Sequence, residues 1–190
     1  MGSLVERPTR DALRLLAPGS VTLVSTMSEG QPNVMTAGWI SAQSLFPTMI
    51  TIAIHPERLT HQFANTSEQF VVNIPVLDQI SVVHSAGLVS GRAGDKFAAL
   101  RVEPMESTVV EAPRVSGCAG YIECQVKDRV NAGDHDLFIA EVVYVAADDE
   151  SFDGFWNIAV DAGRLLHHLG ADRYAGLSHA LQATSTEEEE

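Results

Sequence analysis

A basic and a hydroxyl side chain, Arg58 and Thr60, occur where a strand is expected to end and a helix to begin. The first N–H groups of a helix have no partner within the helix, so an anion can accept hydrogen bonds from them. A guanidinium group adds charge-assisted hydrogen bonds to a phosphate. The pattern therefore predicts a phosphate site, to which Lys96 or Arg92 could add a second cation. Few cations are available for such a site, because the chain has only 12 Lys and Arg residues.

Sequence motifs of several other enzyme classes are missing. No G-x-S-x-G, P-loop or G-x-G-x-x-G motif occurs, which removes the usual markers of serine hydrolases, NTPases and Rossmann dehydrogenases. The seven histidines show no H-x-x-x-H or H-x-H spacing. His167 and His168, adjacent on an expected strand, would point to opposite faces. We therefore expect no metal site, and we assign no catalytic acid or base.

The composition is typical of one soluble domain, with 45% hydrophobic and 19% charged residues. The formal net charge of −13 argues against nucleic acid and anionic membrane as partners, because both bind basic surfaces. Neither a membrane-spanning run nor a signal peptide is visible, so we expect a cytoplasmic protein. We expect an N-terminal arm at 1–11, one domain at 12–177, and an acidic, disordered tail at 178–190.

The hydrophobic pattern predicts a mainly β fold with short helices. Strands are expected at 21–27, 34–41, 49–54, 70–74, 118–130 and 135–147, helices at 11–17, 58–66, 76–85 and around 97–100, and an apolar strand or turn at 165–169. No repeat or linker divides the chain, so we expect the strands to close into one β-barrel without edges. Cys118 and Cys124 would lie about 20 Å apart on one strand, too far to pair, and would be small core residues.

Five blocks of sequence occur in the order and spacing of a known family. They are NVMTAGWIS at 33–41 with SLFP at 44–47, HPERLTH at 55–61, SGRAGDKF at 90–97, GDH at 133–135 with FIAEV at 138–142, and LHHLG at 166–170 with RY at 173–174. Over residues 12–177 the chain thus resembles the flavin reductase-like family, FMN-binding split β-barrels that include flavoredoxins and NAD(P)H:flavin oxidoreductases. The resemblance implies a homodimer that binds FMN, or alternatively FAD, in a groove near the subunit interface.

The same resemblance assigns the isoalloxazine ring to the first block. Small residues on a strand let a ring approach the backbone and accept hydrogen bonds from its N–H groups. The ring edge would be contacted by Met35, Thr36, Ala37 and Gly38, and polar contacts would come from Ser41 and Ser44. The plainer interpretation is a strand whose glycine is only a bulge.

The other blocks would bind the rest of the cofactor. Arg58 and Thr60 would hold the FMN phosphate, with Lys96 or Arg92 as the second cation. The alternatives are a solvated Arg58 and an ion pair between Lys96 and a neighbouring acid such as Asp95.

Three imidazole groups are further candidates. By resemblance, His168 rather than His167 would lie near the cofactor, unless it is a surface or core residue. His55, followed by Pro56, would either polarise a flavin carbonyl or cap its strand. His135 is expected to anchor the hairpin between the two long strands.

The resemblance leaves three functions open. The preferred one is hydride transfer from NAD(P)H to flavin, which needs ring stacking and exclusion of water. The second is an FMN-binding, flavoredoxin-like electron carrier that a protein partner reduces. The third is a barrel that has lost flavin and binds another small ligand such as haem. The sequence does not decide between NADH and NADPH, nor whether the acceptor is free flavin for a monooxygenase, a ferric compound or a protein.

Overall fold

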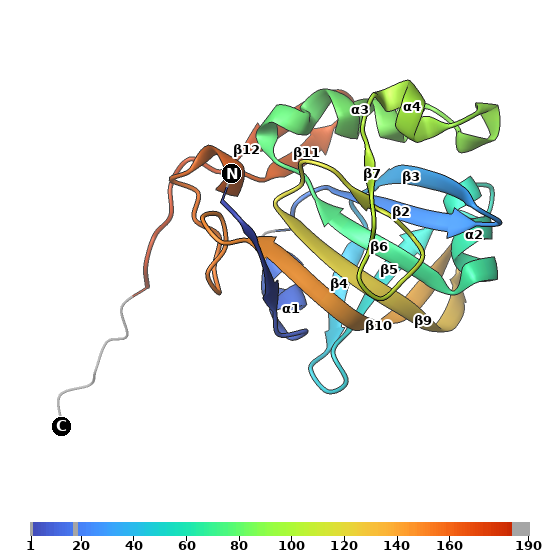
Figure 1. The fold of residues 1–190 in the computed structure, drawn as a ribbon, viewed down its shortest axis with the longest axis horizontal. Helices are drawn as coiled ribbons and strands as arrows, with labels where there is room; N and C mark the ends of the chain where they lie inside the picture. The colour runs from blue at the N-terminus through green and yellow to red at the C-terminus, as the bar shows by residue number, and fades with distance from the viewer. Residues whose placement is uncertain (1, 17–18, 184–190) are drawn as a thin grey trace.

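The computed structural model describes residues 2–16 and 19–183, and an antiparallel sheet forms its centre (Figure 1). The strands are hydrogen-bonded in the order β3-β2-β6-β9-β10-β5-β4, and β1 pairs with β10 beside this path. Their bounds are Leu4–Arg7 (β1), Thr22–Ser28 (β2), Gln31–Ala37 (β3), Ile40–Ser44 (β4), Met49–Ile54 (β5), Gln69–Ile74 (β6), Gly120–Ala132 (β9) and His135–Asp148 (β10). The predicted mainly β fold is confirmed.

Short helices cover the sheet. α2 (Leu59–Ser67) packs on β2, α3 (Ile80–Leu88) and α4 (Lys96–Leu100) pack on β3, and α1 (Asp11–Leu16) packs against β4. Figure 1 shows α3 and α4 lying together over β3. The remaining elements are β7 (Pro104–Met105), β8 (Arg114–Val115), β11 (Leu166–Gly170), β12 (Arg173–Gly176) and the 3-10 turns η1 (Leu77–Gln79), η2 (Gly91–Ala93) and η3 (Asp161–Gly163).

The sheet is open, so the expectation of a closed barrel is wrong. β3 and β4 stand at opposite ends of the hydrogen-bonded path. The single strand expected at 34–41 is also wrong, because β3 ends at Ala37 on β2 and β4 begins at Ile40 on β5. Only Gly38 and Trp39 separate the two strands, which keeps their ends within about 11 Å of each other. The short connection therefore requires the sheet to curl into a split barrel.

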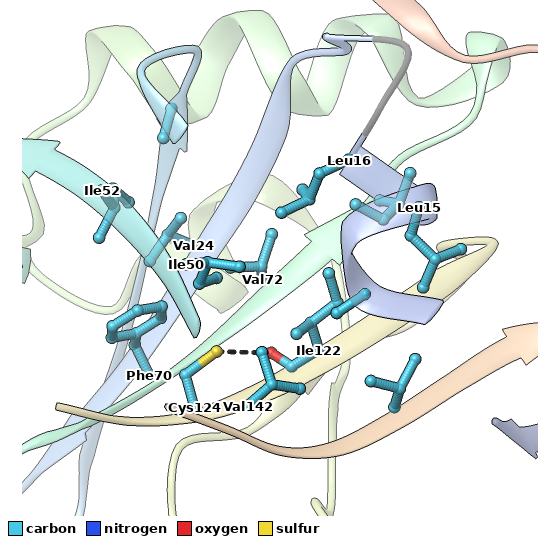
Figure 2. Close-up of a cluster of buried hydrophobic side chains, with 14 of the residues drawn as sticks. Leu15, Leu16, Val24, Ile50, Ile52, Phe70, Val72, Ile122, Cys124 and Val142 are labelled. Carbon is cyan, nitrogen blue, oxygen red and sulfur yellow. Dashed lines mark hydrogen bonds between the residues drawn. The ribbon is translucent and has the colours of Figure 1, made fainter. Parts of the chain in front are cut away.

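One of the two buried hydrophobic clusters lies inside this curled sheet, and the other includes residues of α3 and α4. Burial alternates along β5, where Ile50, Ile52 and Ile54 are buried as their spacing predicts. Figure 2 shows Leu15 and Leu16 of α1 in the same cluster, together with apolar side chains from β2, β5, β6, β9 and β10.

The two cysteines confirm one prediction and correct another. Cys118 and Cys124 are both buried and free, as expected of small core residues. Cys118 precedes β9 and does not share its strand with Cys124. The pattern could not reveal this, because the ladder between β6 and β9 begins only at Gly120, opposite Ile74.

The two ends of the chain differ in secondary structure. In the N-terminal arm, Leu4–Arg7 forms β1 along the end of β10, a pairing for which the sequence carried no clear signal. Of the predicted tail, 178–183 has no regular secondary structure, and 184–190 lies outside the described residues. Among the described helices, none is long and apolar enough to span a membrane.

Candidate functional site

A cavity of about 600 Å³ opens where β3, the start of α2 and the α3–α4 region meet. Its volume is in the range typical of sites for small molecules and cofactors. Its wall contains nine of the predicted site residues, namely Met35, Thr36, Ala37, Gly38, His55, Arg58, Thr60, Lys96 and His168. The fold thus brings together residues that are spread over more than 130 positions of the chain.

One end of the cavity is formed by the start of α2. Arg58 is the N-cap residue, and no side chain of the described residues caps the helix. Its side chain is exposed and makes no ion pair with any residue that the structure describes. Thr60 is buried, and its Oγ1 accepts a hydrogen bond of 2.8 Å from Asn33 Nδ2. That bond leaves the Thr60 hydroxyl hydrogen free to donate to an anion.

Lys96 adds a buried cation at the same cavity. It is 3% exposed, and its Nζ donates a hydrogen bond of 2.7 Å to the carbonyl oxygen of Ala86. Burial, and next the nearby charge of Arg58, lower the pKa of Lys96 to about 8. The expected alternative partner, Asp95, instead accepts hydrogen bonds from the backbone of α4. Within the described chain, no acid forms an ion pair with Lys96.

Arg92, the other candidate cation, lies elsewhere. Its Nη1 donates a hydrogen bond of 3.3 Å to Gln62 Oε1. It lines a separate hollow of about 460 Å³ on the far side of Gly91. The structure therefore brings Lys96 to the cavity and leaves Arg92 outside it.

The wall along β3 is formed by backbone and small side chains. Thr36 lines the cavity, but its hydroxyl donates to the carbonyl oxygen of Val83 in α3, so this group serves packing. A Cβ atom at Gly38 would have no neighbour within 4 Å among the described residues. Gly38 thus leaves room for a flat ligand to approach the backbone.

Three aromatic rings stand at another part of the wall. Trp39 is 67% exposed, and its ring centroid lies 4.8 Å from that of His135. His55 lies 5.2 Å from His135. The backbone N–H of Glu57 donates to His55 Nδ1 over 3.2 Å, so His55 Nε2 carries a proton and can donate to a ligand.

His135 is part of both the hairpin and the cavity wall. It is the first residue of β10, at the predicted hairpin, and its side chain lines the cavity. Its Nδ1 lies 2.8 Å from Asp134 Oδ1. This hydrogen bond lowers the pKa of Asp134 and fixes the orientation of the imidazole ring. The sequence interpretation found only the hairpin role.

The adjacent residues His167 and His168 differ in their position relative to the cavity. His168 lines the cavity, and its Nε2 donates a hydrogen bond of 3.0 Å to the carbonyl oxygen of Ala171. Its ring lies 5.1 Å from that of Tyr174. His167 does not line the cavity, and burial lowers its pKa.

Ser41, Ser44 and Pro56 do not line the cavity. Ser41 was expected at the end of the strand that carries Gly38, and Ser44 shortly after it. Because that strand ends at Ala37, both serines belong to β4, where Ser41 is exposed and Ser44 is half-buried. Pro56 is exposed in the turn before α2.

Several wall residues were missed by sequence reasoning, among them Asn33, Ser90 and Gly91. Asn33 is 2% exposed, and its Oδ1 has no hydrogen-bond partner among the residues that the structure describes. A Cβ atom at Gly91 would lie 2.2 Å from that oxygen, so only glycine fits there. All three residues occur in the sequence blocks quoted above, so membership of these blocks could have identified them as candidates.

The titratable side chains of the described residues can be compared with the ligand sets of metal sites. No group of three or more His, Cys, Asp or Glu side chains in the described part of the chain could hold a metal ion. His61 and Asp136, the buried pair nearest in kind, are hydrogen-bonded to each other. The cavity offers two cations, a helix N-terminus and a wall with open space beside Gly38, which fit a phosphorylated planar ligand.

Comparison with solved structures places this geometry among known flavin proteins. The FMN-binding domain of a flavin reductase-like enzyme from Shewanella baltica superposes with a TM-score of 0.88 at 28% identity, covering 96% of this chain and 98% of that one. Flavoredoxin from Methanosarcina acetivorans has a TM-score of 0.77 at 23% identity, covering 86% and 87%. The second likeness concerns the fold alone.

Sequence comparison points the same way. A Pyrococcus abyssi protein is 33% identical over 76% of this chain and 83% of its own length. The reductase component of a Rhodococcus opacus 4-nitrophenol 4-monooxygenase/4-nitrocatechol 2-monooxygenase is 28% identical over 67% of this chain and 65% of its own. The sequence model of the flavin reductase like domain matches residues 14–173. The chain therefore belongs to the flavin reductase-like family.

Proposed function

We propose that this protein is an oxidoreductase that binds FMN in the 600 Å³ cavity and transfers hydride from NAD(P)H to the flavin. One observation carries the proposal. Lys96 is a buried cation without an acidic partner in the described chain, and it shares the cavity with Arg58 and the uncapped start of α2. An unneutralised cationic pair at a helix N-terminus fits a phosphate group.

The remaining wall fits the ring system of the cofactor. Gly38 leaves space beside the backbone of the β3–β4 connection, and His55 Nε2 can donate a hydrogen bond to a ring carbonyl. The exposed Trp39 offers a flat apolar surface at the same wall. Ring and phosphate would thus be held by different elements of the sheet and its covering helices.

The flavin, when bound, supplies the hydride chemistry between nicotinamide and acceptor. The protein groups hold and orient: Arg58, Lys96 and Thr60 bind the phosphate, and the β3 wall positions the ring. Hydride transfer between stacked rings requires no protein acid or base, so we assign no catalytic residue.

The test is a titration of the flavin-stripped protein with FMN, followed by anaerobic mixing with NADH or NADPH while flavin absorbance is recorded. We expect tight FMN binding and rapid bleaching by one or both nucleotides. Binding without bleaching would instead favour the electron carrier. Failure to bind any flavin would overturn the assignment.

The electron carrier is retained as a second candidate because apolar side chains are exposed around the cavity. Trp39 lies in the wall, and Leu88 (74% exposed) and Leu169 (66% exposed) each adjoin a wall residue in sequence. Such side chains suit contact with a protein. Reduction of bound FMN by a reduced redox protein, but not by NADH or NADPH, would select this candidate.

We also propose that the protein forms a homodimer whose interface lies near the cavity. The same exposed apolar residues support this assembly, and a monooxygenase is a further candidate partner because of the Rhodococcus reductase component. Light scattering on the protein as it elutes from a size-exclusion column is expected to give twice the mass of the 20.5 kDa chain. A monomer at micromolar concentration would contradict the dimer.

A further inference from the structure

The charge of Lys96 is unusual for a buried side chain. The residue is 3% exposed, and among the described residues its ammonium group makes one hydrogen bond, to the carbonyl oxygen of Ala86. Burying a charge costs free energy unless an opposite charge or several hydrogen bonds compensate. Asp95, the adjacent acid, is occupied at the start of α4, where it accepts from Phe97 N and Ala98 N. Lys96 therefore lacks the compensation that a bound anion would provide.

The groups around Lys96 increase the free-energy cost of its buried charge. α4 packs against β3, which has no titratable side chain, and against α3, whose one such group, His84, contacts the Tyr174 hydroxyl. Across the cavity, Arg58 repels the ammonium, and together with burial it holds the pKa of Lys96 at about 8. The other titratable groups lining the cavity are His55, Glu57, His135 and His168.

Building on the proposed flavin site, we propose that the cavity takes its ligand as a terminal phosphate dianion and that Lys96 gains a proton as this dianion binds. The dianion attracts the ammonium form and offsets the repulsion from Arg58. The proton comes from solvent, and the complex contains an ammonium group beside a phosphate with two negative charges. A phosphate monoester has its second pKa at about 6, so this group is mostly dianionic above pH 7.

The pH dependence follows from the two states of Lys96. Below pH 8 the side chain is mostly charged in both the free and bound protein, so binding takes up little proton. Above pH 8 the free protein holds a neutral amine, and binding takes up close to one proton. The dissociation constant then rises about tenfold for each pH unit, until the pKa of Lys96 in the complex is reached.

The experiment measures FMN and riboflavin affinity from pH 7 to 9.5 by quenching of flavin fluorescence. Calorimetry at pH 9, in two buffers of different ionisation enthalpy, counts the protons taken up. We expect the dissociation constant for FMN to rise about tenfold between pH 8.5 and 9.5, with uptake of close to one proton. Riboflavin has the same ring but no phosphate, so its affinity should lack this dependence.

Lys96→Met is the matched variant, because it keeps the length of the side chain and removes its charge. We expect its FMN affinity at pH 7 to be about tenfold or more below that of the wild type and to change little up to pH 9.5. Thermal unfolding checks that the variant is folded. Should it not fold, the wild-type pH profile and the proton count still decide.

Three outcomes would overturn the proposal: a flat FMN profile without proton uptake, the same pH dependence for riboflavin, or a wild-type profile in Lys96→Met. Each of these leaves the flavin site intact if FMN binds tightly at pH 7. Absence of FMN binding by the wild type at pH 7 would instead overturn the proposed function. The two failures are thus distinguishable.

Discussion

His61 Nε2 lies 2.8 Å from Asp136 Oδ2, and this contact joins the first turn of α2 to the first residues of β10. Both side chains are largely buried. Asn131 Nδ2 donates to the other carboxylate oxygen over 3.0 Å. Because Thr60 and His135 are the sequence neighbours of this pair, it holds the proposed phosphate end of the cavity and the wall that contains His135 in one arrangement.

This contact predicts a loss of stability in acid. The hydrogen bond from His61, and next that from Asn131, hold the pKa of Asp136 below its usual value. A group with a lowered pKa stabilises the fold above its unfolded pKa, about 3.9, and loses this effect as pH falls through its folded pKa. Asp136→Asn should therefore lower the free energy of unfolding at pH 6–7, and the difference from wild type should shrink as pH falls below about 3.9 and through the lowered pKa of Asp136.

Urea unfolding between pH 2.5 and 7 measures this difference. Asp78→Asn is the control, since Asp78 is exposed and forms no ion pair with a described residue. A difference between Asp136→Asn and wild type that stays constant with pH would contradict the ionic origin of the effect.

Removing the cation at the start of α2 should weaken binding of the phosphate selectively. Arg58→Ala is expected to raise the dissociation constant for FMN by about 10- to 100-fold, the loss of one charge-assisted hydrogen bond. Riboflavin binding should change less than threefold, and the melting temperature should stay constant because Arg58 is exposed. Equal losses for both flavins would show that Arg58 does not contact the phosphate.

Two glycines in the cavity wall should respond differently to alanine. At Gly91 the added Cβ would lie 2.2 Å from Asn33 Oδ1 and 2.8 Å from Leu59 Cδ2, so Gly91→Ala should destabilise the fold by about 1–3 kcal/mol. At Gly38 the Cβ meets no atom within 4 Å, and Gly38→Ala should cost less than about 0.5 kcal/mol. Chemical unfolding compares them. Similar costs would mean that Gly91 is not tightly packed.

A buried ion pair outside the cavity should dominate the stability of the 104–115 segment. Glu123 is fully buried and accepts hydrogen bonds from Arg114 and from the backbone of Thr108, Val109 and Val110. Arg114→Met leaves this carboxylate without its cation and should cost about 3–5 kcal/mol.

The exposed ion pair between Lys127 and Glu141, 3.0 Å apart, is the matched control. Lys127→Met should change the free energy of unfolding by less than about 1 kcal/mol. If both substitutions cost the same, burial would not be the source of the stability.

The sequence alone determined features that depend on neighbouring residues. The alternation of Ile50, Ile52 and Ile54 predicted a half-buried strand, and Arg58 with Thr60 marked a strand-to-helix junction suited to an anion. Both are local, because side-chain direction within a strand or a first helical turn follows from the backbone period. The order of the five blocks also predicted the family, which the comparisons confirm.

The tertiary structure decided which distant side chains meet. Lys96 reaches the cavity because α4 packs on β3, whereas Arg92, four residues earlier, faces a separate hollow from η2. Hydrophobic spacing does not encode that difference, since it depends on how each segment packs against residues far away in the chain. In the same way, the change from β2 to β5 as pairing partner at Gly38 removed Ser41 from the wall. A break in strand pairing is a property of the whole sheet, and the local pattern of 34–41 suits one strand as well as two.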